Sequence, residues 1–167
     1  IIFTGGTTES INLVAHAWGI KFLEEENNVI VSEMEHHSNL VPWQMVTEQK
    51  GASLKFIPLT DDGTLNLKEL DSYFSSNTKL MSLVHQSNVF GTVNPIKSLI
   101  DKAKSIGAIT MIDGAQAVPH SKVDITQLEC DFYAFSGHKM TGPTGVGVLI
   151  GRTDLLEEMD PFMGGGE

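Results

Sequence analysis

Lys139 stands in a glycine-rich segment between two apolar stretches of the chain. Residues 130–135 before it are rich in aromatic side chains and residues 146–150 after it are aliphatic, so a buried strand is predicted on each side. A lysine held near apolar walls loses part of its preference for the charged form, and its amine becomes a usable nucleophile. Most loop lysines are simply solvated, so this interpretation depends on which other segments meet Lys139.

Asp113 is the second chemically suggestive residue, because it follows the apolar stretch 108–112 directly. A carboxylate at the end of a buried strand is costly unless it is paired, so Asp113 needs a cationic partner. A protonated pyridine nitrogen would serve. Gln116 could donate to a phenolic oxygen of the same ring, and His36 could stack on the ring face.

Residues 1–8 combine a short apolar stretch, the glycines Gly5 and Gly6, and the hydroxyls of Thr7 and Thr8 before an amphipathic segment. A strand, a glycine turn and a helix start arranged in this way can bind phosphate through backbone N–H groups and hydroxyls. An ordinary helix cap explains the same residues, and from this stretch alone the cap is favoured. Taken with Lys139 and Asp113, however, these features describe the requirements of pyridoxal 5'-phosphate (PLP).

Short apolar stretches alternate with longer amphipathic ones along the chain, which favours βαβ units and a largely parallel sheet. Ligands of such sheets bind at the carboxyl ends of the strands, where the polar residues named above would meet. Strands are expected at residues 1–4, 29–31, 54–59, 79–84, 108–112, 130–135 and 146–150. Helices are expected after Gly6, after the loop 32–39, from a capping box at 66–69 and from Pro95.

Composition narrows the class of protein further. The 167 residues are 41% hydrophobic, enough for one domain with a core, and the net charge of −10 disfavours nucleic acid and anionic membranes as partners. No apolar run approaches the length of a membrane span. The single cysteine, Cys130, excludes a disulfide framework, so a reducing cytoplasmic setting is expected, with an organellar matrix or stroma also compatible.

Five motifs, taken in order, resemble those of the class V aminotransferase superfamily, and within it the SufS/CsdA-type (group II) cysteine desulfurases are most similar. The resemblance covers the whole chain and implies an α/β fold: the three-layer, mainly parallel sheet of the fold type I PLP-dependent transferases. Residues 1–167 would form much of the PLP-binding large domain, truncated at both ends. The motifs are Gly6–Val14, Met34–Asn39 with Val41–Gln44, Ser87–Gly91, Asp113–Ala117 and Ser136–Lys139.

The resemblance also implies a role for each matching residue. Lys139 would carry PLP as a Schiff base and move the substrate α-proton, Asp113 would keep the pyridine nitrogen protonated, and Gln116 would bond the ring hydroxyl oxygen. His36 would stack on the ring and could act in acid–base steps, and Asn88 would lie near the substrate carboxylate. The phosphate would be held by Thr8, Ser136 and His138, with Thr7 in the same cofactor-binding set, and Gly164 and Gly165 would line the entrance near a dimer partner.

The implied reaction converts L-cysteine to alanine and delivers sulfur as a persulfide to an acceptor protein for iron–sulfur cluster assembly, in a homodimer. In that family the persulfide-forming cysteine and the arginine for the substrate carboxylate lie in a C-terminal part that residues 1–167 do not include, so this fragment is expected to be inactive alone. Cys130 is no substitute, because a core or strand-edge thiol is expected there.

Other functions compete with this interpretation. Selenocysteine lyases, transaminases and epimerases share the fold and cofactor residues. A non-catalytic dinucleotide- or phosphate-binding module is disfavoured because the first strand is not followed by Gly-x-Gly-x-x-Gly. A metal site at His36 and His37 is disfavoured, since adjacent histidines in an extended segment point to opposite faces and no third ligand has a suitable spacing.

Overall fold

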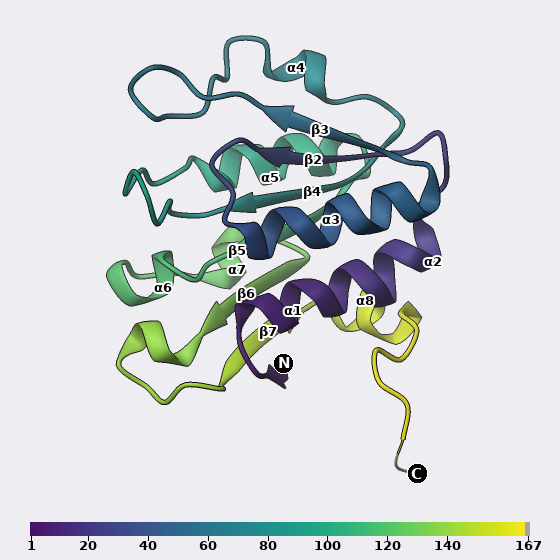
Figure 1. Ribbon diagram of the computed structural model, residues 1–167. Helices are drawn as coiled ribbons and strands as arrows, with labels where there is room; N and C mark the ends of the chain where they lie inside the picture. The colour runs from purple at the N-terminus through teal and green to yellow at the C-terminus, as the bar shows by residue number, and fades with distance from the viewer. Residues whose placement is uncertain (166–167) are drawn as a thin grey trace.

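One mixed β-sheet runs through the computed structural model, which describes residues 1–165 (Figure 1). Within these residues the sheet has seven strands in the order β1-β7-β6-β5-β4-β2-β3. The strands are β1 Ile2–Thr4, β2 Asn28–Ser32, β3 Ser53–Ile57, β4 Thr78–Val84, β5 Ile109–Asp113, β6 Phe132–Ser136 and β7 Gly147–Gly151.

The direction of the strands determines where their loops meet. Strands β3, β2, β4, β5 and β6 are parallel to one another, whereas β7 is antiparallel to both β6 and β1. Because β1 and β6 both run against β7, β1 has the direction of β6. The carboxyl ends of β1 to β6 therefore lie at one edge, and the predicted mainly parallel sheet is confirmed.

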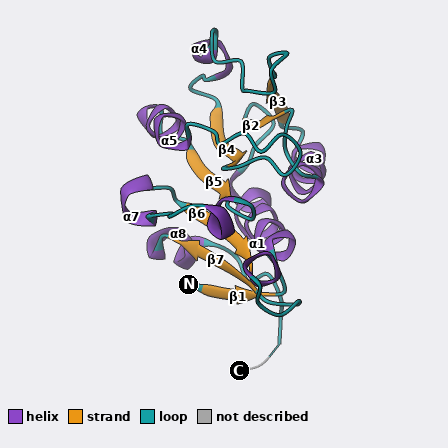
Figure 2. Cartoon of the chain, turned by 90° about the vertical axis from the view of Figure 1, so that its left-hand side faces the viewer, coloured by secondary structure: helices purple, strands orange, loops and turns teal. Residues whose placement is uncertain are grey.

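Helices cover both faces of this sheet, with α1 and α3 on one face and α5 on the other (Figure 2). No helix among residues 1–165 is long and apolar enough to cross a membrane. The helical segments are α1 Thr7–Val14, the π-helical Ala15–Gly19, α2 Ile20–Phe22, α3 His37–Lys50, α4 Leu70–Tyr73, α5 Ile96–Ser105, α6 Ala117–His120, α7 Ile125–Leu128, the 3₁₀ turn η2 Gly137–Met140 and α8 Thr153–Glu158.

The core consists of two apolar clusters separated by the sheet. In β4, Leu80 belongs to the cluster under α1 and α3, whereas Met81 and Leu83 belong to the cluster under α5. In β5, Met111 and Ile112 divide in the same way. Successive strand residues point to opposite faces, so strands covered on both sides are apolar throughout. The three-layer architecture predicted from sequence is therefore present.

The start of α3 was predicted too late in the chain. The helix begins at His37 rather than after the loop 32–39, because the His36 imidazole caps it by accepting a hydrogen bond from the Ser38 amide (3.1 Å). Serine, threonine, aspartate and asparagine are the usual capping residues, so a histidine cap gives little sequence signal.

Other boundaries were also wrong, and for two of them the structure shows the reason. The capping box predicted at residues 66–69 does not form, because the Asn66 amide donates to the Pro58 carbonyl (2.8 Å) and α4 begins only at Leu70. Strand β6 begins at Phe132 instead of residue 130. The amide of Asp131 donates to Thr110 Oγ1 (2.9 Å), so the chain there is held by a side chain rather than by strand pairing.

The turn between β1 and α1 lies directly against β7. Gly147 pairs with both Thr4 and Ser136, and a Cβ atom built on Gly147 would lie 2.4 Å from the Gly6 Cα atom. Only a glycine permits this approach, which brings the Thr7 amide within 2.8 Å of Ser136 Oγ. The contact therefore joins the first strand turn to the end of β6.

Gly147→Ala should destabilise the protein by about 1–3 kcal/mol, because the added methyl must displace the backbone of the Gly6 turn. Urea denaturation measures the change. Gly164→Ala is the matched control: no atom of the described residues lies within 4 Å of a Cβ built there, so its stability should stay within about 0.5 kcal/mol of the parent. Equal stability of the two variants would contradict the close approach.

Candidate functional site

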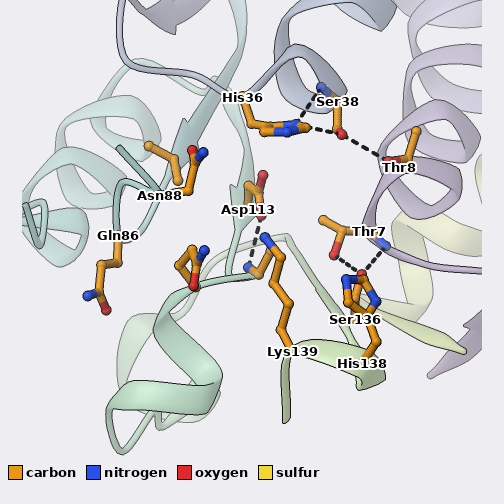
Figure 3. A pocket seen from close by; sticks show the side chains of 13 residues that line it. Thr7, Thr8, His36, Ser38, Gln86, Asn88, Asp113, Ser136, His138 and Lys139 are labelled. Carbon is orange, nitrogen blue, oxygen red and sulfur yellow. Dashed lines mark hydrogen bonds between the residues drawn. The ribbon is translucent and has the colours of Figure 1, made fainter. Parts of the chain in front are cut away.

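A cleft of about 260 Å³ opens at the carboxyl edge of the sheet, where the loops after β1, β2, β4, β5 and β6 meet (Figure 3). All the residues that sequence analysis assigned to cofactor or catalysis line it, so the predicted meeting of these loops is observed; the individual roles stay predictions. They are Thr7, Thr8, His36, Asn88, Asp113, Gln116, Ser136, His138 and Lys139. Ser38 and Gln86, which sequence analysis did not single out, line it too.

Asp113 lies at the end of β5 with 3% of its surface exposed. Its Oδ1 accepts a hydrogen bond from the Ala115 amide (2.9 Å), and within residues 1–165 the carboxyl group has no other hydrogen bond and no ion pair. Burial raises the pKa of Asp113, while the Ala115 amide and the positive charges of Lys139 and His36 act in the opposite direction. Figure 3 shows the Lys139 side chain reaching toward this carboxylate.

A second buried acid, Asp131, shows what a fully compensated carboxylate looks like in the same sheet. Asp131 is 2% exposed; its Oδ2 accepts from the amide and the hydroxyl of Thr110 (2.8 Å each), and its Oδ1 accepts from Arg152 (2.9 Å). Asp113 is buried to a similar extent but has no such side-chain partners. An acceptor left short of donors at the wall of a cleft fits a ligand that brings its own N–H group.

Lys139 is held by the loop that follows β6. The Gly137 amide donates to the Val146 carbonyl (2.8 Å) and the Gly142 amide donates to the Gly137 carbonyl (3.0 Å), which closes the loop on itself. A Cβ on Gly142 would lie 2.9 Å from that carbonyl oxygen, so the tight closure requires glycine. Lys139 lies in the 3₁₀ turn inside this loop and is partly buried.

A cradle of donors lies at the start of α1. The Thr7 amide and hydroxyl both contact Ser136 Oγ (2.8 and 2.7 Å), and Gly6 before them has φ +154°, which favours glycine. The next amides of the helix, beginning with Thr8, have no carbonyl one turn earlier to pair with. Free amides, hydroxyls and the positive end of a helix dipole suit a phosphate group.

His36 presents its imidazole to the cleft in a defined orientation. Its Nδ1 atom accepts from the Ser38 amide (3.1 Å), so a neutral ring carries its proton on Nε2. Ser38 Oγ contacts the same Nδ1 atom (2.8 Å) and also Thr8 Oγ1 (2.9 Å). A chain of hydrogen bonds therefore joins the His36 imidazole to the donors at the start of α1, through a serine whose only sequence signal is its place after the cap.

Glu35 was also missed by sequence analysis. It is a partly buried acid beside His36 that accepts from Ser32 Oγ (2.5 Å), the Asn39 side chain (2.6 Å) and the Val84 amide (3.1 Å). Burial raises the pKa of Glu35 to about 8, although these hydrogen bonds act to lower it. A charged residue in a polar loop gives no sequence signal of burial.

Stability of the cofactor-free protein should fall as the pH rises between about 4.5 and 8. Over that window folded Glu35 keeps a proton that the unfolded chain has released. The contribution of Glu35 to the free energy of unfolding is therefore fully present below pH 4.5 and is lost as the pH rises through about 8. The slope that Glu35 contributes is about 1.4 kcal/mol per pH unit at most. Urea denaturation across this range measures it.

The matched control is Glu33→Gln, on the same loop, where an exposed carboxylate accepts from the Leu59 amide (3.0 Å). This variant should keep the parent's slope. Glu35→Gln should lose the part of the slope that Glu35 contributes and keep the parts that Asp113 and His85 contribute. An unchanged slope in Glu35→Gln would contradict the assignment.

Cys130 is separate from the cleft. It is 8% exposed, and burial raises the pKa of its thiol to about 12, so it is a protonated thiol at neutral pH. The expected core position is therefore confirmed. In the described part of the chain no group of three or more histidine, cysteine, aspartate or glutamate side chains could hold a metal ion.

Comparisons with known proteins agree with this geometry. The sequence profile of the family Aminotransferase class-V matches residues 1–167. The cysteine desulfurase of Salmonella newport (strain SL254) is 53% identical over 166 residues, 99% of this chain and 41% of the relative. The crystal structure of the cysteine desulfurase CsdA from Escherichia coli superposes with a TM-score of 0.95 at 44% identity, covering 99% of this chain and 41% of that one.

A further solved structure, SspA in complex with cysteine, superposes with a TM-score of 0.89 at 30% identity, covering 99% of this chain and 47% of that one. The chain belongs to the class V aminotransferase family, whose members depend on PLP. Its fold is that of CsdA, a PLP-dependent enzyme of fold type I. The chain spans about two fifths of the length of the curated cysteine desulfurases it matches.

Proposed function

We propose that residues 1–167 form the PLP-binding part of a cysteine desulfurase. The observation that carries the proposal is Asp113: a buried, under-bonded carboxylate that faces a lysine in a cleft with an anion cradle at its other side. PLP matches all three features, because it has a basic ring nitrogen, an aldehyde that lysine attacks and a phosphate. The cysteine desulfurases among its relatives support the choice of reaction.

The residues of the cleft would bind each part of the cofactor. Asp113 would accept a hydrogen bond from the ring nitrogen and hold a proton on it. Gln116 would donate to the ring oxygen, and the imidazole of His36, fixed by Ser38, would stack on the ring face. The phosphate would lie at the start of α1, against Thr7, Thr8, Ser136 and His138.

Two residues would act on the substrate. PLP, when bound, supplies an electron sink that weakens bonds at the substrate α-carbon. Lys139, whose Nζ atom lies at the centre of the cleft, would first bind the cofactor and then move the substrate α-proton. Asn88, exposed at the mouth of the cleft, would donate to the substrate carboxylate.

The substrate of the proposed reaction is L-cysteine, as the cysteine complex of the related SspA suggests. The C–S bond breaks, alanine is released, and the sulfur bonds to a cysteine thiolate as a persulfide. Cys130 does not suit this acceptor role, because it is buried and protonated. We infer that the acceptor cysteine comes from outside residues 1–167. We also infer that the protein works as a homodimer and passes the sulfur to an acceptor protein for iron–sulfur cluster assembly.

Lys139→Ala tests the proposal. The full protein with added PLP should show a visible absorbance band that borohydride removes, and mass analysis should find the reduced cofactor on Lys139. The variant should have no such band, because it has no amine at the centre of the cleft. Alanine formation from cysteine should fall to background in the same variant.

The matched control is Lys122→Ala, an exposed lysine away from the cleft, which should keep both the band and alanine formation. A folded parent protein without the band would overturn PLP binding. A parent with the band that forms no alanine from cysteine would overturn the reaction but not the cofactor.

A further inference from the structure

Strands β2 and β4 separate at the carboxyl edge, just beside the cleft. Their pairing ends at Ile30 and Met81, whereas β2 continues to pair with β3 as far as Ser32 and β4 continues to pair with β5 as far as Val84. The Val84 amide therefore has no β2 carbonyl to donate to. A buried backbone N–H without an acceptor is costly, so something else must fill this split.

The carboxyl group of Glu35 fills it. One of its oxygens, Oε1, accepts from the Val84 amide (3.1 Å) and from Ser32 Oγ (2.5 Å), in the place where a strand carbonyl would be. The other, Oε2, accepts from the Asn39 side chain (2.6 Å). One side chain thus joins the end of β2, the first turn of α3 and the edge of β4.

A second layer of hydrogen bonds fixes Asn39. Its Oδ1 atom accepts from Ser82 Oγ (2.5 Å) and from the indole N–H of Trp43 (3.2 Å). Asn39, Ser82 and Trp43 are fully buried and Ser32 is 1% exposed. Because water does not reach these groups, each donor and acceptor must be satisfied within the network, which permits one arrangement of side chains.

His36 follows Glu35 directly and is exposed, and among the described residues its ring has hydrogen bonds only to Ser38 (Figure 3). The backbone before His36 is tied to β4 through the Glu35 carboxyl group, and the backbone after it enters α3, where Asn39 is tied to the same group. The position of the imidazole over the cleft therefore depends on both ends of this short segment.

We propose that Glu35 is a positioning residue: its carboxyl group closes the split between β2 and β4 and thereby fixes the His36 imidazole over the cleft. Its importance for catalysis rests on the proposed function, in which His36 stacks on the cofactor. The structural claim, that the Glu35 carboxyl group closes the split and fixes His36, is tested in the cofactor-free protein. The structural claim and the proposed function can therefore fail separately.

Glutamine cannot replace Glu35 in this network. With its nitrogen toward Asn39, two NH₂ groups face each other; with its nitrogen toward Val84, an NH₂ group faces a backbone N–H. Turning the Asn39 amide over would place its nitrogen against the donors of Ser82 and Trp43. Every arrangement leaves buried donors without acceptors, whether or not the native carboxyl group carries a proton.

A second substitution restores the pattern. In the double variant Glu35→Gln with Asn39→Asp, the glutamine oxygen accepts from Ser32 and Val84 and its NH₂ group donates to one aspartate oxygen. The other aspartate oxygen accepts from Ser82 and Trp43. The carboxylate has moved from residue 35 to residue 39, and each donor named above has an acceptor again.

The experiment uses NMR of the full protein without PLP, observing the His36 imidazole and the Trp43 indole N–H. We expect Glu35→Gln to shift both signals and the double variant to return them toward the parent positions. Glu33→Gln, the matched control on the same loop, should shift neither, and the indole of Trp18, on the first helix, should not move in any variant. In a second measurement, PLP affinity should fall roughly tenfold in Glu35→Gln and recover in the double variant.

An unchanged His36 signal in folded Glu35→Gln would overturn the proposal. If that variant does not fold, the double variant decides: a folded double variant with parent-like His36 and Trp43 signals supports the network, and a double variant that is unfolded or has displaced signals overturns it. Protein that behaves as expected in the NMR experiment but binds no PLP would leave the network standing and refute the proposed function instead.

Discussion

A carboxylate buried at the end of a central strand is the constraint on which the site depends. Asp113 is as buried as Asp131, but Asp131 has an arginine and a threonine as partners and Asp113 has one backbone amide. A charge desolvated to this extent is tolerated where a cation faces it. Lys139 partly provides one, and a cofactor with a protonated ring nitrogen would provide a better one.

The direction of the strands explains how five loops reach this carboxylate. Strands β1 to β6 end at the same edge, and the antiparallel β7 returns the chain so that Gly147 lies against Gly6. The start of α1 and the Lys139 loop are thereby brought next to each other at the cleft that Asp113 lines. The split between β2 and β4 provides the remaining side, where the loop of Glu35 and His36 enters.

Sequence patterns predicted the sheet, its direction and the residues of the cleft because these depend on apolar runs and on polar residues at strand ends. Asp113 and Lys139 stand out in this way. Glu35 and Ser38 do not: their importance comes from the split between two strands and from a histidine cap, which are tertiary features. The capping box predicted at Asn66 failed for a local reason, because the chain turns back between Leu59 and Leu65 and the Pro58 carbonyl accepts a hydrogen bond from the Asn66 amide.

The protonation state of the ring nitrogen in the PLP-bound full protein tests the central claim most directly. With ¹⁵N-labelled PLP, the nitrogen chemical shift reports whether that atom carries a proton. We expect the shift of a protonated pyridine at neutral pH and above in the parent. In Asp113→Asn the ring nitrogen should have a lower pKa, so that on raising the pH it loses its proton earlier than in the parent. A neutral ring nitrogen in the parent protein at neutral pH would contradict the claim that the cleft is built around the charge of Asp113.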